Sequence, residues 1–197
     1  MEITKNESDA LMKIFTDYLT DYNAFSIKGT LGMTGVGSMK LLKRMEEKGL
    51  LRSRKMGNAT FYKANLENEY TVKLLELISL DHGHLSNYVK GWITDLRKNA
   101  IPKAVFIFGS ILRKGKDAND IDVCFILSDS HDYKNMQKEV DIMNEKSRQK
   151  IHPLYLTEKD LYEKLGQKDA PVISMVKSCV IAKGEELFVR VIKDVQG

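Results

Sequence analysis

Cysteine is scarce in this sequence of 197 residues, and long apolar runs are missing from it. Its two cysteines, Cys124 and Cys179, are too few for a disulfide framework and lack the spacing of metal ligands, so we expect buried, reduced thiols. No apolar run approaches the roughly 20 residues needed to cross a bilayer. The N-terminus MEITKNESDA is polar and lacks the basic-then-apolar order of a secretory signal. These absences predict a cytoplasmic protein that does not cross a membrane.

Charged residues, by contrast, make up 29% of the chain and hydrophobic residues 43%, a balance typical of one or two globular domains. The net charge of +4 is unevenly distributed. Residues 28–63 contain nine Lys and Arg residues and two Glu residues. The net charge of this segment is therefore +7, which leaves −3 for the rest of the chain. A positive field concentrated in one segment indicates a polyanionic partner, because neutralised phosphates release counterions. The alternative is an ordinary solvated face of lysines and arginines.

The periodicity of the first 66 residues predicts three helices followed by a hairpin. Apolar residues at helical spacing follow Ser8, which we expect to cap the first helix. A short second helix is expected over residues 26–31. The turn GMTGVGSMK then ends at Ser38, the expected cap of a third helix that stops at Gly49. The runs LLRSRK and ATFYKANL are strand-like and are separated by a Met-Gly-Asn turn at residues 56–58, which predicts a hairpin.

This order of elements over residues 7–66 resembles a winged helix-turn-helix domain. The phrase LLKRMEEKGLLRSRKMGNATFYKANL is similar to its recognition helix and wing. The resemblance implies that the third helix enters the major groove of double-stranded DNA while the hairpin approaches phosphates. The residues implied for DNA binding are Lys40, Lys43 and Arg44 on the helix, with Arg52, Arg54 and Lys55 on the hairpin. The alternatives are a protein-interaction or dimerisation module of the same shape, and RNA as the nucleic acid.

Residues 69–100 are expected to form connecting helices, interrupted by the stretch DHGHLSN. Many DNA-reading domains bind as dimers. We therefore expect the first of these helices to pack on the winged helix or to pair with a second copy in a homodimer.

Two strands of buried type frame a polar loop between residues 104 and 127. The first ends at Gly109, where the backbone can approach a bound anion, and Ser110 opens a short helix whose N–H groups point outward. Arg113 adds a cationic side chain to this turn. On the second strand, residues two apart face the same side, so Asp120 and Asp122 present both carboxylates on one face. Two hard oxygen ligands suit Mg²⁺, which binds one or two protein carboxylates together with substrate phosphates.

The sequence Gly109-Ser110 followed by Asn119-Asp120-Ile121-Asp122 resembles the motif of the nucleotidyltransferase superfamily, the polymerase-β-like fold, over about residues 86–195. Arg113 matches the basic residue common in that turn, whereas Lys114 and Asn119 stand where the family often has Gly and Ser. The resemblance implies a mixed sheet flanked by helices and Mg²⁺ as cofactor. It makes Asp120 and Asp122 catalytic metal ligands, and it places Gly109, Ser110 and Arg113 at the phosphates of an NTP, with ATP the first choice.

A third carboxylate is missing where active members of the superfamily usually carry one, on the strand after the next helix. That helix is expected at residues 133–150, and the strand is IHPLYLT. The matching position lies near His152, and no Asp or Glu occurs between Glu145 and Glu158. The loss of one metal ligand, and of a base for the attacking hydroxyl, argues against turnover without abolishing nucleotide binding. His152 is either a substitute base or a structural residue beside Pro153.

We therefore expect an α/β (α+β) chain with a winged helix-turn-helix domain at residues 1–68, connecting helices at 69–100 and a nucleotidyltransferase-like domain at 101–197. Two functions follow. In the first, the chain binds DNA and transfers NMP from Mg-NTP to an acceptor that the sequence does not identify. In the second, it is a DNA-binding transcriptional regulator whose C-terminal domain only binds nucleotide or mediates assembly.

Overall fold

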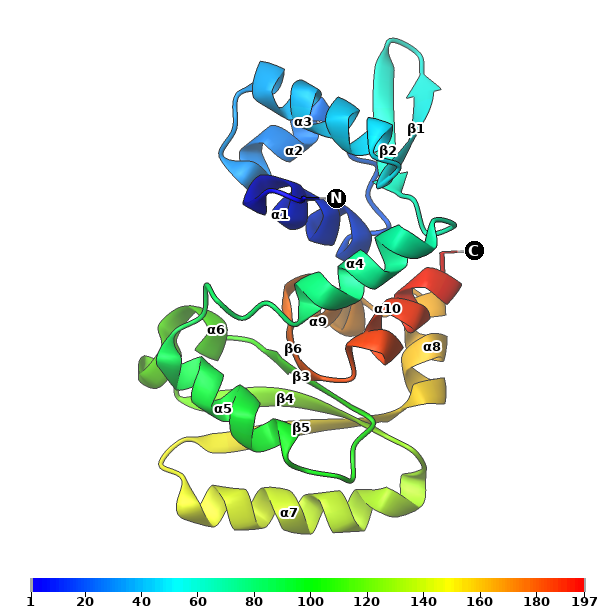
Figure 1. Cartoon of the computed structure of the whole chain (residues 1–197). Helices are drawn as coiled ribbons and strands as arrows, with labels where there is room; N and C mark the ends of the chain where they lie inside the picture. Colours follow the sequence, from blue (N-terminus) through cyan, green and yellow to red (C-terminus); the bar gives the residue numbers. More distant parts are fainter. Residues whose placement is uncertain (1, 197) are drawn as a thin grey trace. The chain divides into compact units, whose positions relative to one another are not determined.

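The computed structural model describes residues 2–196, which form two compact units: residues 2–78 with Gln196, and residues 79–195. The division falls inside the segment 69–100 for which connecting helices were expected. The chain combines helices and strands, and helices flank the sheets, as expected for a mixed α/β protein (Figure 1). Within the described residues no helix combines the length and the apolar character that a membrane span requires.

The first unit consists of three helices, a two-stranded hairpin and a fourth helix. Its elements are α1 (Lys5–Thr16), α2 (Ala24–Leu31), α3 (Gly35–Glu47), β1 (Leu51–Met56), β2 (Ala59–Ala64) and α4 (Glu69–Ser79). The predicted hairpin is confirmed: β1 and β2 pair antiparallel from Leu51 opposite Ala64 to Met56 opposite Ala59. Gly57 makes the turn with a φ of 59°, a conformation that glycine adopts without steric cost.

All three helices before the hairpin begin earlier than predicted, and α2 begins at Ala24 instead of residue 26. Thr4 caps α1 instead of Ser8: the Thr4 hydroxyl accepts a hydrogen bond from the Glu7 backbone N–H at 3.4 Å, and the Glu7 carboxylate accepts one from the Thr4 N–H at 2.8 Å. This reciprocal capping box satisfies two backbone donors, which explains the choice. Thr34 likewise caps α3, and Ser38 lies buried one turn later, where its hydroxyl donates to the Thr34 carbonyl at 3.0 Å. The predictions of Ser8 and Ser38 as caps were therefore wrong.

The second unit is a four-stranded mixed sheet with helices on both faces. Its helices are α5 (Asn87–Arg97), α6 (Ile111–Lys114), α7 (Tyr133–Lys146), α8 (Glu158–Gly166), α9 (Ala170–Ser178) and α10 (Glu185–Asp194). Its strands are β3 (Ala104–Phe108), β4 (Asp120–Leu127), β5 (Lys150–Thr157) and β6 (Val180–Lys183), in the spatial order β5-β4-β3-β6. The β4–β5 pair is parallel and is joined by α7, whereas β3 is antiparallel to both β4 and β6.

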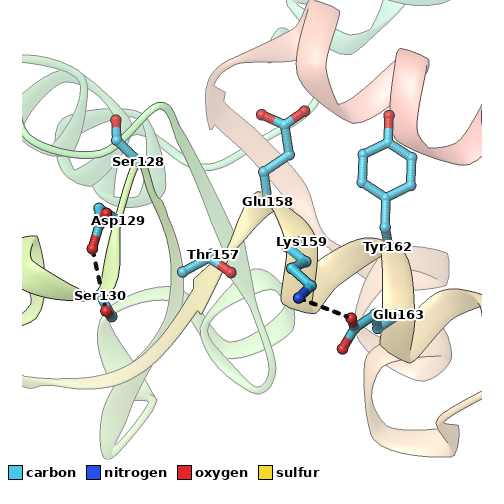
Figure 2. Close-up of a pocket in the computed structure, with 8 residues that line it drawn as sticks. All are labelled: Ser128, Asp129, Ser130, Thr157, Glu158, Lys159, Tyr162 and Glu163. Atoms are coloured by element: carbon cyan, nitrogen blue, oxygen red, sulfur yellow. Dashed lines mark hydrogen bonds and ion pairs between the residues drawn. The ribbon is translucent and has the colours of Figure 1, made fainter.

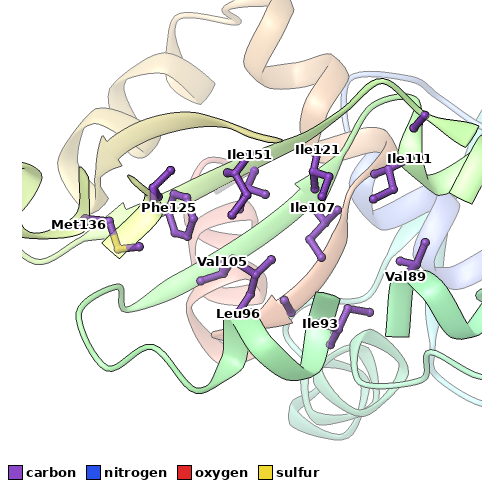
Figure 3. Close-up of a cluster of buried hydrophobic side chains, with 14 of the residues drawn as sticks. Val89, Ile93, Leu96, Val105, Ile107, Ile111, Ile121, Phe125, Met136 and Ile151 are labelled. Carbon is purple, nitrogen blue, oxygen red and sulfur yellow. The ribbon is translucent and has the colours of Figure 1, made fainter. Parts of the chain in front are cut away.

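Both faces of this sheet are covered by apolar side chains. Val105 and Ile107 of β3 and Phe125 of β4 point into the main core, together with residues of α5 and α7 (Figure 3). Phe106 lies between Val105 and Ile107 in sequence and so faces the other side, where its ring meets that of Phe188 in α10 at a centroid distance of 5.3 Å. Because both faces are buried, polar side chains on these strands are confined to the strand ends.

Two expectations for this unit need correction. α7 ends at Lys146 and not at residue 150, because the Asn144 side chain accepts a hydrogen bond from the Ile151 backbone N–H at 2.7 Å and fixes the turn into β5. Both cysteines are free thiols, but only Cys124 is fully buried; Cys179 is half-buried at the end of α9.

Candidate functional site

Asp120 and Asp122 lie at the beginning of β4, at one end of the buried sheet. Ile121 between them is fully buried, so the alternation of the strand turns both carboxylates to the opposite side, where each is half-buried. Phe108, the last residue of β3, is the antiparallel partner of Asp122. The two carboxylates thus lie beside the loop that follows β3.

His152 joins these carboxylates from the neighbouring strand. In the parallel register of β4 and β5, His152 is the partner of Asp122, and its Nδ1 lies 3.3 Å from Oδ2 of Asp120. One ligand atom from each of the three side chains falls within 4.8 Å of the others. Asp120, Asp122 and His152 are called the Asp-Asp-His group below. The residue expected to replace the third carboxylate therefore sits at the carboxylate pair.

The surroundings of Asp122 shift the pKa of its carboxyl upward. Burial of its carboxyl, followed by the nearby charge of Asp120, raises the pKa of Asp122 above its ordinary value, while His152 acts in the opposite direction. A bound cation would relieve the repulsion between the two carboxylates. Two carboxylate oxygens suit Mg²⁺, and an imidazole nitrogen is also accepted by first-row transition metals, so the donor set fits a divalent cation.

Gly109 closes one side of the Asp-Asp-His group. Its φ is +79°, and a Cβ built on this backbone would lie 2.0 Å from Oδ2 of Asp122. A side chain at position 109 would therefore displace the Asp122 carboxylate. This close approach explains why glycine is required between β3 and α6.

Ser110 and Arg113 complete the loop, and among the described residues neither side chain makes a hydrogen bond or ion pair with the Asp-Asp-His group. Ser110 precedes the four-residue α6, makes no side-chain cap, and accepts a backbone hydrogen bond from Arg113 at 3.1 Å. Arg113 is exposed, and within residues 2–196 its guanidinium makes no hydrogen bond or ion pair. The structure thus brings Gly109, Asp120 and Asp122 together and leaves Arg113 available to an anion near the same loop.

A surface cleft of about 620 Å³ lies at the opposite end of β4, between the loop 128–130 and α8 (Figure 2). Its charged groups are already paired within the protein. Lys159 pairs with Glu163 at 3.7 Å, Glu158 accepts from Arg190 at 2.7 Å, and the Tyr162 hydroxyl donates to a carboxylate of α10. Because these interactions leave few groups for a ligand, we regard the Asp-Asp-His group as the better candidate in spite of the size of this cleft.

The six residues expected to bind DNA fall into two groups. Four are exposed and unpaired with acidic groups within residues 2–196: Lys40 and Lys43 on α3, and Arg54 and Lys55 on β1. Arg52 is also exposed, but its guanidinium pairs with Glu67 at 2.7 Å. These five residues are the exposed cations of α3 and β1 that were expected to bind DNA; on β1, Arg52 and Arg54 share one face of the hairpin and Lys55 lies on the other.

Arg44 has an internal partner that sequence reasoning missed. Its Nε donates to Oε1 of the fully buried Glu7 at 2.8 Å, and Nζ of Lys48 lies 2.9 Å from the same oxygen. Burial alone would raise the pKa of Glu7, but hydrogen bonds from the Thr4 backbone, Arg44, Lys48 and the Thr4 hydroxyl lower it to about 2. A Thr-x-x-Glu pattern at residues 4–7 was the available signal for the cap, but nothing local indicated the two cations.

Comparisons of the chain with protein-family models, with curated proteins and with solved structures find no match, so the interpretation of both surfaces rests on their residues and geometry.

Proposed function

We propose that residues 79–195 form a minimal nucleotidyltransferase-like domain that binds an NTP together with a divalent cation. The observation that carries this proposal is the convergence of Asp120, Asp122 and His152 at one strand end, directly beside the glycine loop. This loop supplies a close backbone approach and a free guanidinium, and the carboxylates supply oxygen ligands. The combination suits a triphosphate with its metal.

Each residue has a distinct role in this proposal. Asp120 and Asp122 hold Mg²⁺, which when bound neutralises charge on the phosphate oxygens. The backbone at Gly109 and Ser110, with the Arg113 side chain, holds the triphosphate. An acceptor hydroxyl forms a bond to the α-phosphorus, the bond to the β-phosphate oxygen breaks, and pyrophosphate leaves. His152 is the group at this site that can accept the proton of the attacking hydroxyl.

For the first unit we propose a winged helix that binds double-stranded DNA. The exposed cations of α3 and β1 support it, because a recognition helix and a hairpin wing both use such residues against phosphates. Arg44 is assigned to the fold of this unit through Glu7 and only secondarily to DNA, since its Nε is already occupied.

A transcriptional regulator is the second candidate, and His152 favours it. In active members of the superfamily the position is usually a carboxylate that serves as metal ligand or base. A site with an imidazole there retains nucleotide binding more readily than turnover. In this alternative the second unit senses nucleotide or mediates assembly, and the winged helix delivers the response on DNA.

Calorimetric titration of the full chain with ATP and other NTPs, with and without Mg²⁺, tests the nucleotide proposal. Replacing Asp120 and Asp122 with Asn should remove the Mg²⁺-dependent part of the affinity. The double variant Glu139→Gln and Glu145→Gln, on the exposed side of α7, removes the same number of charges and should leave the titration unchanged. Unchanged Mg²⁺-dependent affinity in the Asn variant would refute the site assignment.

A further inference from the structure

The exposed face of α3 changes character along the helix. Val36, Met39, Lys40 and Lys43 follow one another at the spacing i, i+3, i+4 and i+7, so they share one face. The opposite face of the helix is buried in the core of the unit. Val36 is 62% exposed and Met39 is 49% exposed, although both are large apolar side chains. The exposed face thus begins with two apolar side chains, and two lysines follow them.

Cations follow the apolar patch of Val36 and Met39 on the same face of α3. Lys40 lies one turn after Val36 and Lys43 one turn after Met39, and both lysines are exposed. An apolar patch with lysines beside it complements a polyanion that also presents apolar groups.

The major groove of DNA combines anionic and apolar groups wherever it contains a thymine. Its edge carries the apolar 5-methyl group of thymine between two phosphate backbones. The first residues of a recognition helix reach base edges, and later ones reach phosphates. On α3, Val36 and Met39 come first, where a recognition helix reaches base edges, and Lys40 and Lys43 follow, where it reaches phosphates.

We infer that α3 reads thymine 5-methyl groups through Val36 and Met39, so that this chain prefers A·T-containing duplexes; the inference rests on the DNA binding proposed above. The chemical class of the ligand is a duplex with methylated pyrimidines in its major groove. Lys40 and Lys43 contribute phosphate contacts that do not depend on the sequence.

The inference is tested with the full chain and two alternating duplexes, one of dA and dT and one of dA and dU, which differ only in the 5-methyl group. The uracil duplex should bind about fourfold more weakly for each methyl group that α3 buries in the thymine duplex. Val36→Ala with Met39→Ala should remove most of this difference. Lys40→Ala should weaken binding of both duplexes by the same factor. Leu77→Ala, which shortens an exposed apolar side chain on α4, is the matched control and should change neither affinity.

A second pair of duplexes separates the methyl group from other properties of A·T pairs. A duplex of dG with 5-methyl-dC should bind more tightly than the same duplex with dC. Equal affinities within both pairs would overturn the inference while leaving DNA binding intact. A failure of every duplex to bind, even at low salt, would overturn the inference and the proposed DNA binding together. If Val36→Ala with Met39→Ala instead alters the oligomeric state and leaves the thymine preference unchanged, the patch is a self-association surface and the inference is wrong.

Discussion

Replacement of Glu7 by Gln should destabilise the first unit and remove a large pH dependence from it. Glu7 is fully buried and accepts hydrogen bonds from Arg44, Lys48 and the Thr4 backbone. These interactions hold its pKa at about 2 in the folded chain, against an ordinary value of 4.5. The difference corresponds to about 3 kcal/mol of folding free energy at neutral pH. Breaking a buried ion pair by removing one partner costs a similar amount, about 3–5 kcal/mol.

The sign of the pH dependence follows from the direction of this shift. A carboxyl with a lowered folded pKa stabilises the fold fully above its unfolded pKa, and the stabilisation is lost as the pH falls through the folded pKa. The contribution of Glu7 should therefore be complete above about pH 4.5 and should disappear towards about pH 2. Glu7→Gln cannot ionise, so its unfolding free energy should lack this component.

Hydrogen exchange measured on peptides from α1 and α3 is the suitable assay, because the only tryptophan, Trp92, lies in α5 of the other unit. Protection of these helices should fall in Glu7→Gln at pH 7, and the difference from the wild type should narrow as the pH is lowered. Asp9→Asn removes an exposed carboxylate from the same helix and is the control. Equal protection in wild type and Glu7→Gln, or a difference that persists unchanged at low pH, would refute the role assigned to Glu7.

Three further predictions concern the candidate sites. Gly109→Ala should lower the melting temperature and weaken Mg²⁺-dependent nucleotide binding, because its Cβ would collide with the Asp122 carboxylate. The control is Gly91→Ala on the open face of α5, which should stabilise the chain by up to about 1 kcal/mol. His152→Asp should lower the melting temperature in chelator and restore it with Mg²⁺, because a third carboxylate repels the pair until a cation binds; a melting temperature indifferent to Mg²⁺ would contradict the geometry. Alanine at three cations of the hairpin, Arg52, Arg54 and Lys55, should weaken the proposed duplex binding. The slope of its salt dependence should fall by about 0.9 for each phosphate that is no longer neutralised, and an unchanged slope would mean that these cations do not contact DNA.

The hairpin and the aspartate pair could be predicted from sequence because their signals are local. A Gly-Asn turn between two strand-like runs fixes the hairpin, and the two-residue period of a strand places Asp120 and Asp122 on one face. The first residues of the helices were harder to predict, since any Ser or Thr near the start of a helix can act as its cap. The choice becomes clear only when a residue three positions later can hydrogen-bond back to the cap. Glu7 is that residue for Thr4 and excludes Ser8.

Interactions between distant segments were beyond local patterns. Arg44 and Glu7 are 37 positions apart, so a cation that belongs to an internal ion pair looked the same as one that faces solvent. The placement of His152 beside Asp122 depends on the register of two parallel strands, which is set by the packing of α7 and the strand interiors. The exposure of Val36 and Met39 was equally hidden, because an apolar residue in a helix is by default assigned to the core.

His152 is the residue that distinguishes the two proposed functions. Two carboxylates and an imidazole present less negative charge to an incoming triphosphate than three carboxylates would, so the nucleotide is repelled less when the cation is scarce. A domain that only senses nucleotide gains from this, because its occupancy then follows nucleotide more than Mg²⁺. The reduced negative charge would slow a transferase, because the carboxylates that hold the metal also align the phosphates for attack through that metal. Nucleotide affinity should therefore depend less on Mg²⁺ in the wild type than in His152→Asp. If the chain is a transferase, the rate of nucleotide transfer should also be higher in His152→Asp than in the wild type. If the wild type already shows the stronger dependence on Mg²⁺, the imidazole is acting as a metal ligand in its own right, and the argument for a regulator loses its main support.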